Sequence, residues 1–486
     1  MMQIEDWIKG KRVLLLGFGR EGQSTYRLLR KLGGWKQLAV ADRAERRELA
    51  AADQAERQKL AAADQAERQK PAAADQAEKG EFPEKIRWIS GPDYQKAMDA
   101  YDVVFKSPGI VLERPIETYA CRILSQMEVF FQLYRDRIIG ITGSKGKSTT
   151  TSLLYHILKT AGRKVILAGN IGIPVFDCMD EVDEDTEIIV ELSCHQLEYM
   201  TVSPHIAILL NIYEEHLDHY GTMENYVRAK EQIYRHQQPE DLFICGEQCL
   251  PDKNSCPSCL IPVMDLGNER KGAEINADSS VCLSGDCISW KGQAYRVPLS
   301  DIRLLGHHNC YDIAFVYAAC RLKGISDEEF TRGLTTYQPL PHRLAFLGEK
   351  DGVKYYDDSI STICEAAIQA LNTLTDADTV LIGGMDRGID YRDLIEYLSG
   401  STVEHIILME ATGKRIFGEI NKQYPAFERK ERIIVVDHLE EAVQTAKKVT
   451  RPGRSCVLSP AAASYGIFKN FEERGDVFRE LVFNDA

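Results

Sequence analysis

Short apolar runs alternate with stretches of helical periodicity at the start of the chain. Residues 13–16 and 38–42 are apolar runs of strand length, separated by a glycine-rich turn and a helical pattern. The turn has the sequence Gly17-Phe-Gly-Arg-Glu-Gly22, and a further apolar run at 102–105 leads into Lys106-Ser-Pro-Gly109. Strand, turn, helix and strand in this order predict half of a doubly wound α/β unit.

The same alternation returns twice more along the chain. We therefore predict an α/β fold with three domains, each with a mainly parallel sheet. The N-terminal and C-terminal domains are expected to be Rossmann-like, and the central domain to resemble a P-loop ATPase. The expected domains are residues 1–126, 127–341 and 342–486. The later strands are expected at 138–141, 188–192, 206–212, 355–358, 379–382, 406–409, 433–437 and 456–459, with helices after Gly306, at 365–374 and from Glu440.

Between about residues 44 and 81 the composition changes abruptly. Asp-Gln-Ala-Glu recurs at Asp53, Asp64 and Asp75, a period of eleven residues, within a tract of Ala, Glu, Gln, Lys and Arg. These residue types favour helices, but Leu49 and Leu60 are the only sizeable apolar residues, so the tract cannot build a core. We expect a solvated helical or disordered insertion, with a coiled-coil docking arm as the alternative.

Composition narrows the classes of function. A formal net charge of −14 argues against nucleic-acid binding or attachment to anionic lipid as the main role. Residues 1–10 lack the basic start and apolar stretch of a secretory signal, and no apolar run approaches transmembrane length. Thirteen cysteines, an odd number spread over the chain, fit reduced thiols. We expect a cytoplasmic protein.

The strongest chemical signal is Thr142-Gly-Ser-Lys-Gly-Lys-Ser-Thr149, which follows an apolar strand and precedes an apolar-periodic helix. Glycines let backbone N–H groups surround phosphate oxygens, and the helix N-terminus adds partial positive charge. Lys147 is then placed to reach the terminal phosphates, and the next hydroxyl residues to bind Mg²⁺. The spacing differs from the usual nucleotide-triphosphatase loop, because Ile141 lies five residues before Gly146, where that loop has glycine.

Two further polar residues follow apolar strands of the central region. Glu191 lies at the end of the run 188–192, and His216 follows the run that ends at Ile212. An acidic residue at a strand end, or a lone histidine, is most often solvated or capping. Beside a phosphate loop, however, a carboxylate is a suitable Mg²⁺ ligand, so we assign both residues to the phosphate and metal site.

The glycine turn at 17–22 has two interpretations. Gly-x-Gly-x-x-Gly after a strand most often indicates a dinucleotide site. Nothing else in the sequence indicates hydride chemistry, so the residues alone leave the ligand of this turn open.

A series of motifs follows along the chain. The motifs are Thr142 to Thr150, Gly169-Asn-Ile-Gly172, Glu191-Leu-Ser-x-x-Gln-Leu-Glu198, Asn211 to Asp218, Arg228-Ala-Lys230, Gly306-x-His-Asn309, Leu340-Pro-His-Arg343, Asp358-Ser359, Leu458-Ser-Pro-Ala461 and Ala463-Ser-Tyr-x-x-Phe-Lys-Asn-Phe-Glu-x-Arg-Gly475. In this order they resemble the Mur ligases of peptidoglycan-precursor synthesis, over nearly the whole chain outside the insertion. The last motif is similar to the branch that adds D-glutamate to UDP-N-acetylmuramoyl-L-alanine.

The resemblance implies an ATP-dependent ligase that forms an amide bond and releases ADP and phosphate. The implied substrates are UDP-N-acetylmuramoyl-L-alanine and glutamate. ATP phosphorylates the acceptor carboxylate to an acyl phosphate, and the amine then displaces phosphate. Two Mg²⁺ ions and carbamylation of Lys230 are also implied. We expect no nucleic-acid partner, no membrane insertion and a monomer.

The resemblance also assigns roles residue by residue, although Lys230 on the sequence alone would be an ordinary surface residue of a helix. Catalytic roles fall to Lys147, His216, Lys230 and Arg343, and metal binding to Ser148, Glu191, His216 and carbamylated Lys230. ATP binding falls to Gly143, Ser144, Lys145, Gly146, Lys147, Ser148, Thr149, Asn309, Arg343 and Asp358. The UDP substrate is assigned to Gly17, Arg20, Glu21, Asp42, Arg43, Ser107, Gly109 and Asn170, and the amino acid to Thr362, Arg387, Ser464 and Phe471.

Three positions depart from the family pattern. Lys145 stands where the phosphate loop usually has Asn, which adds a cation beside the phosphates. Asp312 replaces a usual Asn, so it can accept a hydrogen bond from the adenine amino group but cannot donate one. Ile360 stands where the family typically has Lys, and Arg387 is the cation we expect to compensate. The choice between D-glutamate, L-glutamate and another amino acid therefore stays open.

Two other functions remain as alternatives. A folylpolyglutamate-type ligase would share the ATP and metal motifs but should lack the first domain with its glycine turn. A nucleotide-binding regulator that kept the fold and lost turnover is the second alternative, suggested by Ile360.

Six cysteines fall between Cys245 and Cys287. The spacing of Cys245 and Cys249, followed by Cys256 and Cys259, is compact but lacks the separation of a zinc ribbon. We expect free thiols in a variable loop region, with a structural zinc ion as the alternative.

Overall fold

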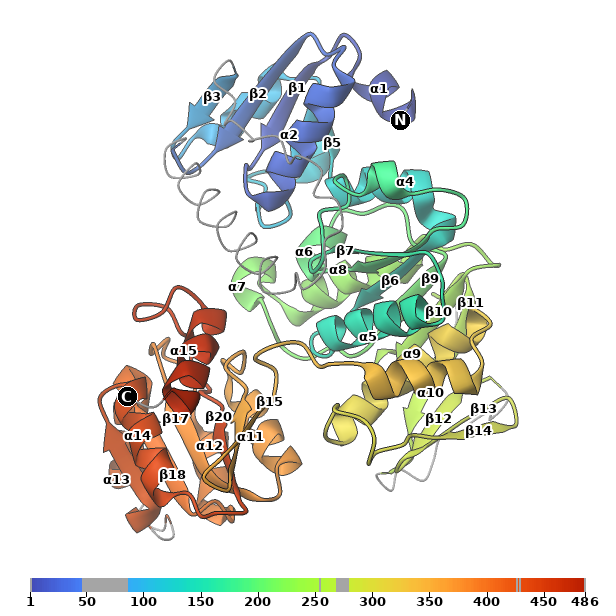
Figure 1. The fold of residues 1–486 in the computed structure, drawn as a ribbon. Helices are drawn as coiled ribbons and strands as arrows, with labels where there is room; N and C mark the ends of the chain where they lie inside the picture. Colours follow the sequence, from blue (N-terminus) through green and yellow to red (C-terminus); the bar gives the residue numbers. More distant parts are fainter. Residues whose placement is uncertain are drawn as a thin grey trace. The chain divides into compact units, whose positions relative to one another are not determined.

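The computed structural model describes residues 2–45, 86–252, 255–267, 279–424, 427 and 430–484 (Figure 1). They form two compact units, Met1–Pro298 with Tyr311–Thr335, and Leu299–Cys310 with Thr336–Ala486. The repeats at Asp53, Asp64 and Asp75 lie outside the described residues, so the insertion stays a prediction. None of the described helices is long and apolar enough to cross a membrane.

The first sheet is parallel throughout, with strand order β3-β2-β1-β4-β5. Helix α2 begins directly after the glycine turn, and Leu28 and Leu29 on its inner face are buried in the core beside the sheet. The turn thus lies at the carboxyl end of β1, the edge at which open α/β sheets bind ligands. The elements are α1 (Met2–Ile8), β1 (Arg12–Leu16), α2 (Arg20–Leu32), β2 (Gln37–Asp42), β3 (Arg87–Ser90), β4 (Val103–Lys106) and β5 (Arg122–Leu124).

The central sheet has the strand order β14-β13-β12-β11-β10-β9-β6-β8-β7. From β7 to β12 neighbouring strands are parallel, and β12, β13 and β14 form an antiparallel meander that was not predicted. Its two tight turns contain Gly285 and Gly292 at positive φ, which two-residue hairpin loops favour. The strands are β6 (Ile138–Thr142), β7 (Val165–Gly169), β8 (Glu187–Glu191), β9 (Ile206–Leu209), β10 (Leu242–Gly246), β11 (Cys259–Asp265), β12 (Val281–Ser284), β13 (Cys287–Trp290) and β14 (Gln293–Arg296).

Helices cover the central sheet and carry several of the candidate residues (Figure 1). They are α4 (Gln126–Tyr134), α5 (Lys147–Thr160), α6 (Cys194–Leu197), α7 (Leu217–Tyr220), α8 (Met223–Arg235), α9 (His307–Leu322) and α10 (Asp327–Thr336). Strands β6 and β9 are buried along their whole length, as expected for the middle of a parallel sheet covered on both faces.

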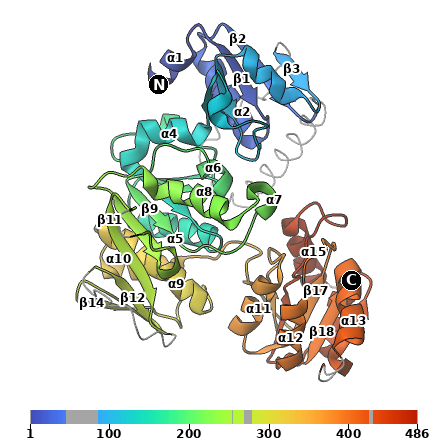
Figure 2. The same cartoon turned by 180° about the vertical axis from the view of Figure 1, so that it is seen from behind.

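The third sheet, shown in orange and red from behind in Figure 2, has the order β15-β16-β20-β17-β18-β19. Only the edge strand β15 is antiparallel to its neighbour. Helices α11, α12 and α13 share one apolar core with the sheet, and α14 and α15 share another. The elements are β15 (Ala345–Lys350), β16 (Val353–Asp357), α11 (Cys364–Thr373), β17 (Ala377–Gly383), α12 (Arg392–Gly400), β18 (His405–Met409), α13 (Glu410–Gln423), β19 (Ile433–Val436), α14 (Leu439–Val449), β20 (Ser455–Leu458) and α15 (Phe471–Phe483).

The predicted α/β class with three mainly parallel sheets is confirmed. The strands predicted from apolar runs are present, with ends displaced by at most three residues. The bounds 1–126, 127–341 and 342–486 remain predictions, because the compact units join the first two sheets into one body.

Candidate active site

The phosphate loop joins β6 to α5 at the carboxyl end of a buried strand. Gly146 caps α5 in a left-handed conformation, with φ at 81°. A Cβ atom there would lie 2.5 Å from a carboxylate oxygen of Asp312, so only glycine fits. The hydroxyl of Tyr226 lies 2.8 Å from Ser144 Oγ and fixes the start of the loop. The N–H groups of Ser144 and Lys145 donate to Asn211 O and Asn211 Oδ1 at 2.9 and 2.8 Å, and the loop ends at the N-terminus of α5, the part of a helix that favours anions.

Two lysines donate to the same backbone carbonyl of this loop. Lys147 Nζ lies 2.9 Å from Gly143 O, and Lys230 Nζ lies 2.7 Å from it. Burial, reinforced by the charge of Lys147, lowers the pKa of Lys230 to about 7. Burial also lowers the pKa of Lys147, while the charge of Glu191 opposes that shift. The expectation that Lys230 is a surface residue is wrong, because it lies on the inner face of α8 and is 1% exposed.

Glu191 ends β8, the strand that pairs with β6, and its side chain is fully buried. Its Oε1 accepts a hydrogen bond of 2.7 Å from Asn170 Nδ2. Its Oε2 is buried and has no hydrogen-bond partner among the described residues. A buried carboxylate oxygen without a donor is costly unless a cation meets it. The structure thus brings Asn170, assigned to the UDP substrate, against the predicted metal ligand Glu191.

His216 precedes the short helix α7 and adopts a left-handed conformation with φ at 56°. Its exposed ring lies 5.0 Å, centroid to centroid, from the ring of His195. Glu215, next to it, forms an ion pair with Lys145 of the phosphate loop. Ser148 is half-buried on the first turn of α5. His195 and Glu215 were not predicted as site residues, although both lie inside motifs recognised in the sequence.

The glycine turn of the first sheet requires glycine at two positions. A Cβ atom on Gly17, whose φ is 91°, would lie 2.8 Å from Ser107 Cβ. A Cβ atom on Gly22 would lie 2.2 Å from Gly17 O. The backbone N–H of Phe18 donates to Asp42 Oδ2 at 2.8 Å, so the carboxylate of Asp42 holds the turn in shape.

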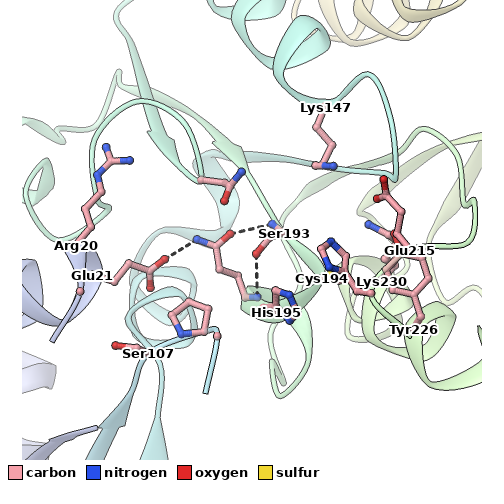
Figure 3. A pocket seen from close by; sticks show the side chains of 16 residues that line it. Arg20, Glu21, Ser107, Lys147, Ser193, Cys194, His195, Glu215, Tyr226 and Lys230 are labelled. Carbon is pink, nitrogen blue, oxygen red and sulfur yellow. Dashed lines mark hydrogen bonds between the residues drawn. The ribbon is translucent and has the colours of Figure 1, made fainter. Parts of the chain in front are cut away.

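A cavity of about 500 Å³ in the first unit brings the glycine turn and the phosphate loop together (Figure 3). Figure 3 shows Arg20 and Glu21 on one side of this cavity and Lys230 on the other. Gln196 links the two sides by donating to Glu21 Oε1 at 2.6 Å. The predicted residues that line the cavity are Arg20, Glu21, Ser107, Gly109, Lys147, Asn170, His216 and Lys230, and those not predicted include Ser193, Cys194, His195, Gln196, Glu215 and Tyr226.

In the second unit, Asp358 is a buried carboxylate surrounded by donors. Its Oδ2 accepts from Ser459 Oγ at 2.7 Å and from Ser361 Oγ at 2.5 Å. Its Oδ1 accepts from the backbone N–H of Leu344 at 3.1 Å. Burial nevertheless raises the pKa of Asp358 to about 6. Nearby, Arg343 Nε is buried without a hydrogen-bond partner among the described residues.

The residues assigned to the amino acid follow neighbouring strands of the third sheet. Thr362 follows β16, Ser464 follows β20 and Arg387 follows β17, so all three lie beyond the carboxyl ends of adjacent parallel strands. Arg387 Nη2 donates to Thr362 O at 3.1 Å. Phe471 begins α15, and its carbonyl accepts from Ser359 Oγ at 2.8 Å. The topology thus gathers these residues at one edge of the sheet.

Two more candidate residues of the second unit make backbone contacts. Asn309 Nδ2 donates to Leu305 O at 2.5 Å. The backbone N–H of Ile360 donates to His342 O at 3.1 Å, and its side chain is half-buried. The apolar residue at position 360 therefore belongs to a fixed turn after β16.

Two family models match the chain, and two of its curated relatives are described with them. The Mur ligase middle domain matches residues 141–320, and the Mur ligase glutamate ligase domain matches residues 342–462. The UDP-N-acetylmuramoylalanine–D-glutamate ligase of Clostridium kluyveri is 34% identical over 415 residues, 83% of this chain and 87% of the relative. The ligase of the same name from Geobacillus kaustophilus is 32% identical over 483 residues, 97% of each chain.

The chain belongs to the Mur ligase family. Relatives named UDP-N-acetylmuramoylalanine–D-glutamate ligase match over most of the chain, so the resemblance found in the motifs is confirmed. Among solved Mur ligases, MurC of Thermotoga maritima is 16% identical with a TM-score of 0.54, over 97% of this chain and 98% of that one. MurF of Acinetobacter baumannii is 18% identical with a TM-score of 0.55, over 98% of this chain and 92% of that one. These two structures share the fold.

The candidate residues of this Mur ligase divide between the two matched domains. The middle-domain match contains Lys147, Glu191, His216 and Lys230. The glutamate ligase match contains Arg343, Asp358, Thr362 and Arg387, while Ser464 and Phe471 follow its end at residue 462. The first sheet precedes both matches.

The six cysteines of the Mur ligase middle region do not form a metal-ligand group within the part of the chain that the structure describes. All thirteen cysteines of the chain are free thiols. The groups of possible ligand atoms that the structure does bring together lie elsewhere, around Cys194 and His195. The geometry thus favours the expected free thiols over a zinc ion at Cys245 to Cys287.

Proposed function

We propose that this chain joins D-glutamate to UDP-N-acetylmuramoyl-L-alanine at the expense of ATP, releasing ADP and phosphate, in peptidoglycan-precursor synthesis. The acceptor carboxylate takes the terminal phosphoryl group of ATP, and the glutamate amine then displaces phosphate from the acyl phosphate. Relatives named for this ligation are 34% and 32% identical over 83% and 97% of the chain.

One observation carries the proposal, which is the cavity shared by the glycine turn and the phosphate loop. A ligase of this kind must hold a nucleotide sugar and ATP close enough for direct phosphoryl transfer. Arg20, Ser107 and Gly109 line the cavity from the first sheet, and Lys147 lines it from the phosphate loop. The UDP substrate and the phosphates of ATP would then meet in one shared cavity. The alternative function, a folylpolyglutamate-type ligase, would not explain the glycine turn of the first sheet, because such a ligase should lack this domain.

The phosphate loop can exchange its internal hydrogen bonds for bonds to phosphate. Lys147 Nζ donates to the carbonyls of Gly143 and Ser144, both at 2.9 Å. Phosphate oxygens are charged acceptors and therefore stronger partners for an ammonium group than neutral carbonyls. Lys147 would turn from the loop to the terminal phosphate and offset the charge that builds up on its oxygens.

The residues around the loop fit a magnesium site. The orphaned Oε2 of the fully buried Glu191 is a hard oxygen donor, and Ser148 lies on the first turn of α5. We assign Glu191, Ser148, His216 and a carbamylated Lys230 to two Mg²⁺ ions. Bound magnesium would supply charge neutralisation on phosphate and carboxylate oxygens.

Lys230 is suited to carbamylation because its amine is easily neutralised. Only the neutral amine attacks CO₂, forming an N–C bond and releasing one proton. Burial and the charge of Lys147 lower the pKa of Lys230 to about 7, so a large share is neutral at physiological pH. The carbamate would be an anionic oxygen ligand where the free amine is a cation.

Labelled bicarbonate tests the carbamate directly. With ¹³C-bicarbonate we expect one carbamate carbon signal by NMR in the wild-type protein. Lys230→Arg should abolish the signal, because the guanidinium stays charged. Lys159→Arg, a change at an exposed lysine on α5, should leave the signal in place. A signal that survives Lys230→Arg would contradict the assignment.

In the second unit, Arg343, Asn309 and Asp358 are assigned to the nucleotide. Thr362, Arg387, Ser464 and Phe471 are assigned to glutamate. We assign Arg387 to a glutamate carboxylate. Its charge would replace that of the lysine which the family typically has at the position of Ile360. The assignment is supported by their common position beyond the carboxyl ends of β16, β20 and β17.

A phosphate-release assay tests the function as a whole. Purified protein is supplied with ATP, Mg²⁺ and UDP-N-acetylmuramoyl-L-alanine, and phosphate is measured with D-glutamate, L-glutamate or neither. We expect release only with D-glutamate. Lys147→Ala should lower kcat by about 10² to 10³-fold, and the matched Lys159→Ala should not. Amino-acid-independent release, or normal turnover of Lys147→Ala, would reject the proposal.

We further propose that the enzyme works as a monomer in the cytoplasm. The thirteen free thiols suit a reducing compartment. Light scattering on the purified chain measures the molar mass, and a dimer mass would contradict the monomer. Fractionation of cells that express the chain would test the compartment.

A further inference from the structure

Two groups of possible metal-binding side chains lie around α6. Of their members, His216 alone is also assigned to magnesium. Cys194, His195 and His216 each offer one ligand atom, and these atoms lie within 4.8 Å of one another. His195, Glu198 and His219 form a second group under the same criterion. His195 belongs to both groups.

The local structure fixes the first group in place. Ser193 and Gln196 form a capping box, in which Gln196 N–H donates to Ser193 Oγ at 3.2 Å and Ser193 N–H donates to Gln196 Oε1 at 2.8 Å. Cys194 and His195 therefore occupy the first turn of a capped helix. His216 reaches them from the start of α7.

A neighbouring tyrosine orients the His195 ring. The hydroxyl of Tyr220 lies 3.3 Å from His195 Nδ1, and the two rings are stacked with an interplanar angle of 7°. A hydrogen bond to one ring nitrogen fixes the orientation in which the other nitrogen meets a metal, as in many histidine metal sites.

The donor set selects the kind of ion. A thiolate and two imidazoles are the ligands of zinc and similar borderline divalent ions, whereas Mg²⁺ takes hard oxygen ligands. Three protein ligands also leave a fourth tetrahedral position for water or substrate. All three residues line the 500 Å³ cavity, so an ion can enter from solvent.

We propose that Cys194, His195 and His216 form a binding site for a borderline divalent ion of the zinc class, which excludes magnesium by taking His216. On binding, the Cys194 thiol loses its proton and forms a metal–sulfur bond, so one proton is released for each ion bound. The site makes the ligase sensitive to zinc. This consequence for turnover rests on the proposed function, but the binding itself does not.

The second group is the weaker candidate for the ion. Glu198 Oε2 and His219 Nε2 are already partners at 3.1 Å, so an ion would have to break that bond. Neither Glu198 nor His219 lines the cavity. A variant at Glu198 therefore serves as the control that separates the two groups.

Cobalt titration tests the binding. Metal-stripped protein is titrated with Co²⁺, whose thiolate complexes absorb in the near ultraviolet, and zinc is then added to displace it. We expect one ion per chain with a thiolate band. Cys194→Ser should abolish the band. Cys194→Ser and His195→Asn should each weaken zinc binding at least about tenfold, because changing even the hydrogen-bond partner of a metal ligand costs about that much affinity.

Two control variants keep the result specific. Glu198→Gln should keep the band and the affinity, and Cys259→Ser should do so too, because Cys259 is an exposed thiol far along the chain. Wild-type protein without a thiolate band, an unchanged band in Cys194→Ser, or loss of binding in Glu198→Gln would each overturn the proposal. Circular dichroism confirms that the variants are folded.

Zinc inhibition separates this inference from the proposed function. Phosphate release is measured against zinc concentration, and each variant is compared with its own zinc-free rate. We expect a half-inhibitory zinc concentration that rises with magnesium, and that rises at least about tenfold in His195→Asn. Cobalt binding through Cys194 without any ligase activity would sink the proposed function alone. Full ligase activity without cobalt binding would sink the zinc site alone.

Discussion

Two buried carboxylates, Glu191 and Asp358, end or follow strands in different parallel sheets, yet their surroundings differ. Glu191 is fully buried, and only its Oε1 has a hydrogen-bond donor. Asp358 is 4% exposed, and both of its oxygens accept hydrogen bonds, from Leu344, Ser361 and Ser459. The sequence assigned both residues to ligands of the same reaction.

The two residues differ in how the charge of each buried carboxylate is met. Burying an unpaired carboxylate oxygen costs free energy, and a cation bound beside it can offset that cost. Three donors around Asp358 already meet that need within its own unit. We therefore propose that Glu191 meets a metal ion directly, whereas Asp358 serves the nucleotide site by holding the turn after β16.

The largest expected effect comes from Glu191→Gln. The amide oxygen can still accept from Asn170, but the charge that meets magnesium is lost, so kcat for phosphate release should fall by about 10² to 10³-fold. Thermal unfolding should not move to lower temperature, because the change removes an unpaired buried charge. Glu187→Gln, at the other end of β8 and paired with Lys323, is the control with near-normal turnover. Normal turnover of Glu191→Gln would erase the contrast with Asp358.

Asp358→Ala should act on stability. Removing the carboxylate leaves the Leu344 N–H and the hydroxyls of Ser361 and Ser459 without their acceptor in a buried place. Each buried donor left unpaired costs about 1 to 3 kcal/mol, so we expect a loss of about 3 to 5 kcal/mol in the unfolding free energy of the C-terminal unit. Denaturant unfolding measures it. An Asp358→Ala protein as stable as the wild type would show that the hydrogen bonds to Asp358 do not stabilise the unit.

The sequence predicted the strands and several residues of the candidate site, but not the different surroundings of Glu191 and Asp358. Apolar runs located the parallel strands, and motifs located Lys147, Glu191 and His216, because these signals are local. The burial of Lys230 had a local signal too, since Tyr226, Lys230 and Ile233 fall on one face of α8 at helical spacing. The orphaned oxygen of Glu191 depends on Asn170, which comes from the turn after another strand, and no spacing predicts that pairing.

The antiparallel meander of the central sheet was missed for a different reason. Strands β12 to β14 are four residues each, and their exposed edges carry few apolar side chains. Their signal is the pair of glycine turns at Gly285 and Gly292 rather than an apolar run. The meander lies away from the cavity and changes no assignment of the site.

The pH dependence of stability sharpens the view of Asp358. Its folded pKa is raised from the usual 3.8 to about 6 by burial, so the folded state holds the proton more tightly than the unfolded state. The resulting stabilisation is complete below pH 3.8 and is lost as the pH rises to about 6. This loss corresponds to about 2 to 3 kcal/mol.

Asp358→Asn isolates this contribution. Asn has the same shape and can bond the same neighbours, but it does not titrate. We expect the wild-type unfolding free energy to fall, relative to Asp358→Asn, between pH 4 and pH 6. Urea unfolding at a series of pH values measures the difference. Parallel pH profiles for the two proteins would show that Asp358 titrates as it would in an unfolded chain.

The smallest effect is expected at Lys145, the exposed cation of the phosphate loop. Its side chain is 46% exposed and pairs with Glu215, so water screens its charge from the cavity. An exposed ion pair contributes at most about 1 kcal/mol, and Lys145→Asn, which restores the residue usual in the family loop, should change kcat by no more than about threefold. Lys147, two residues further on, is half-buried and donates to its own loop, and its loss should cost far more. Measuring kcat for Lys145→Asn and Lys147→Ala under the same conditions compares the contribution of an exposed lysine with that of a half-buried one. A hundredfold loss of kcat in Lys145→Asn would mean that the phosphates lie over the exposed side of the loop. The assignment of the phosphate site to the buried groups around Glu191 would then be wrong.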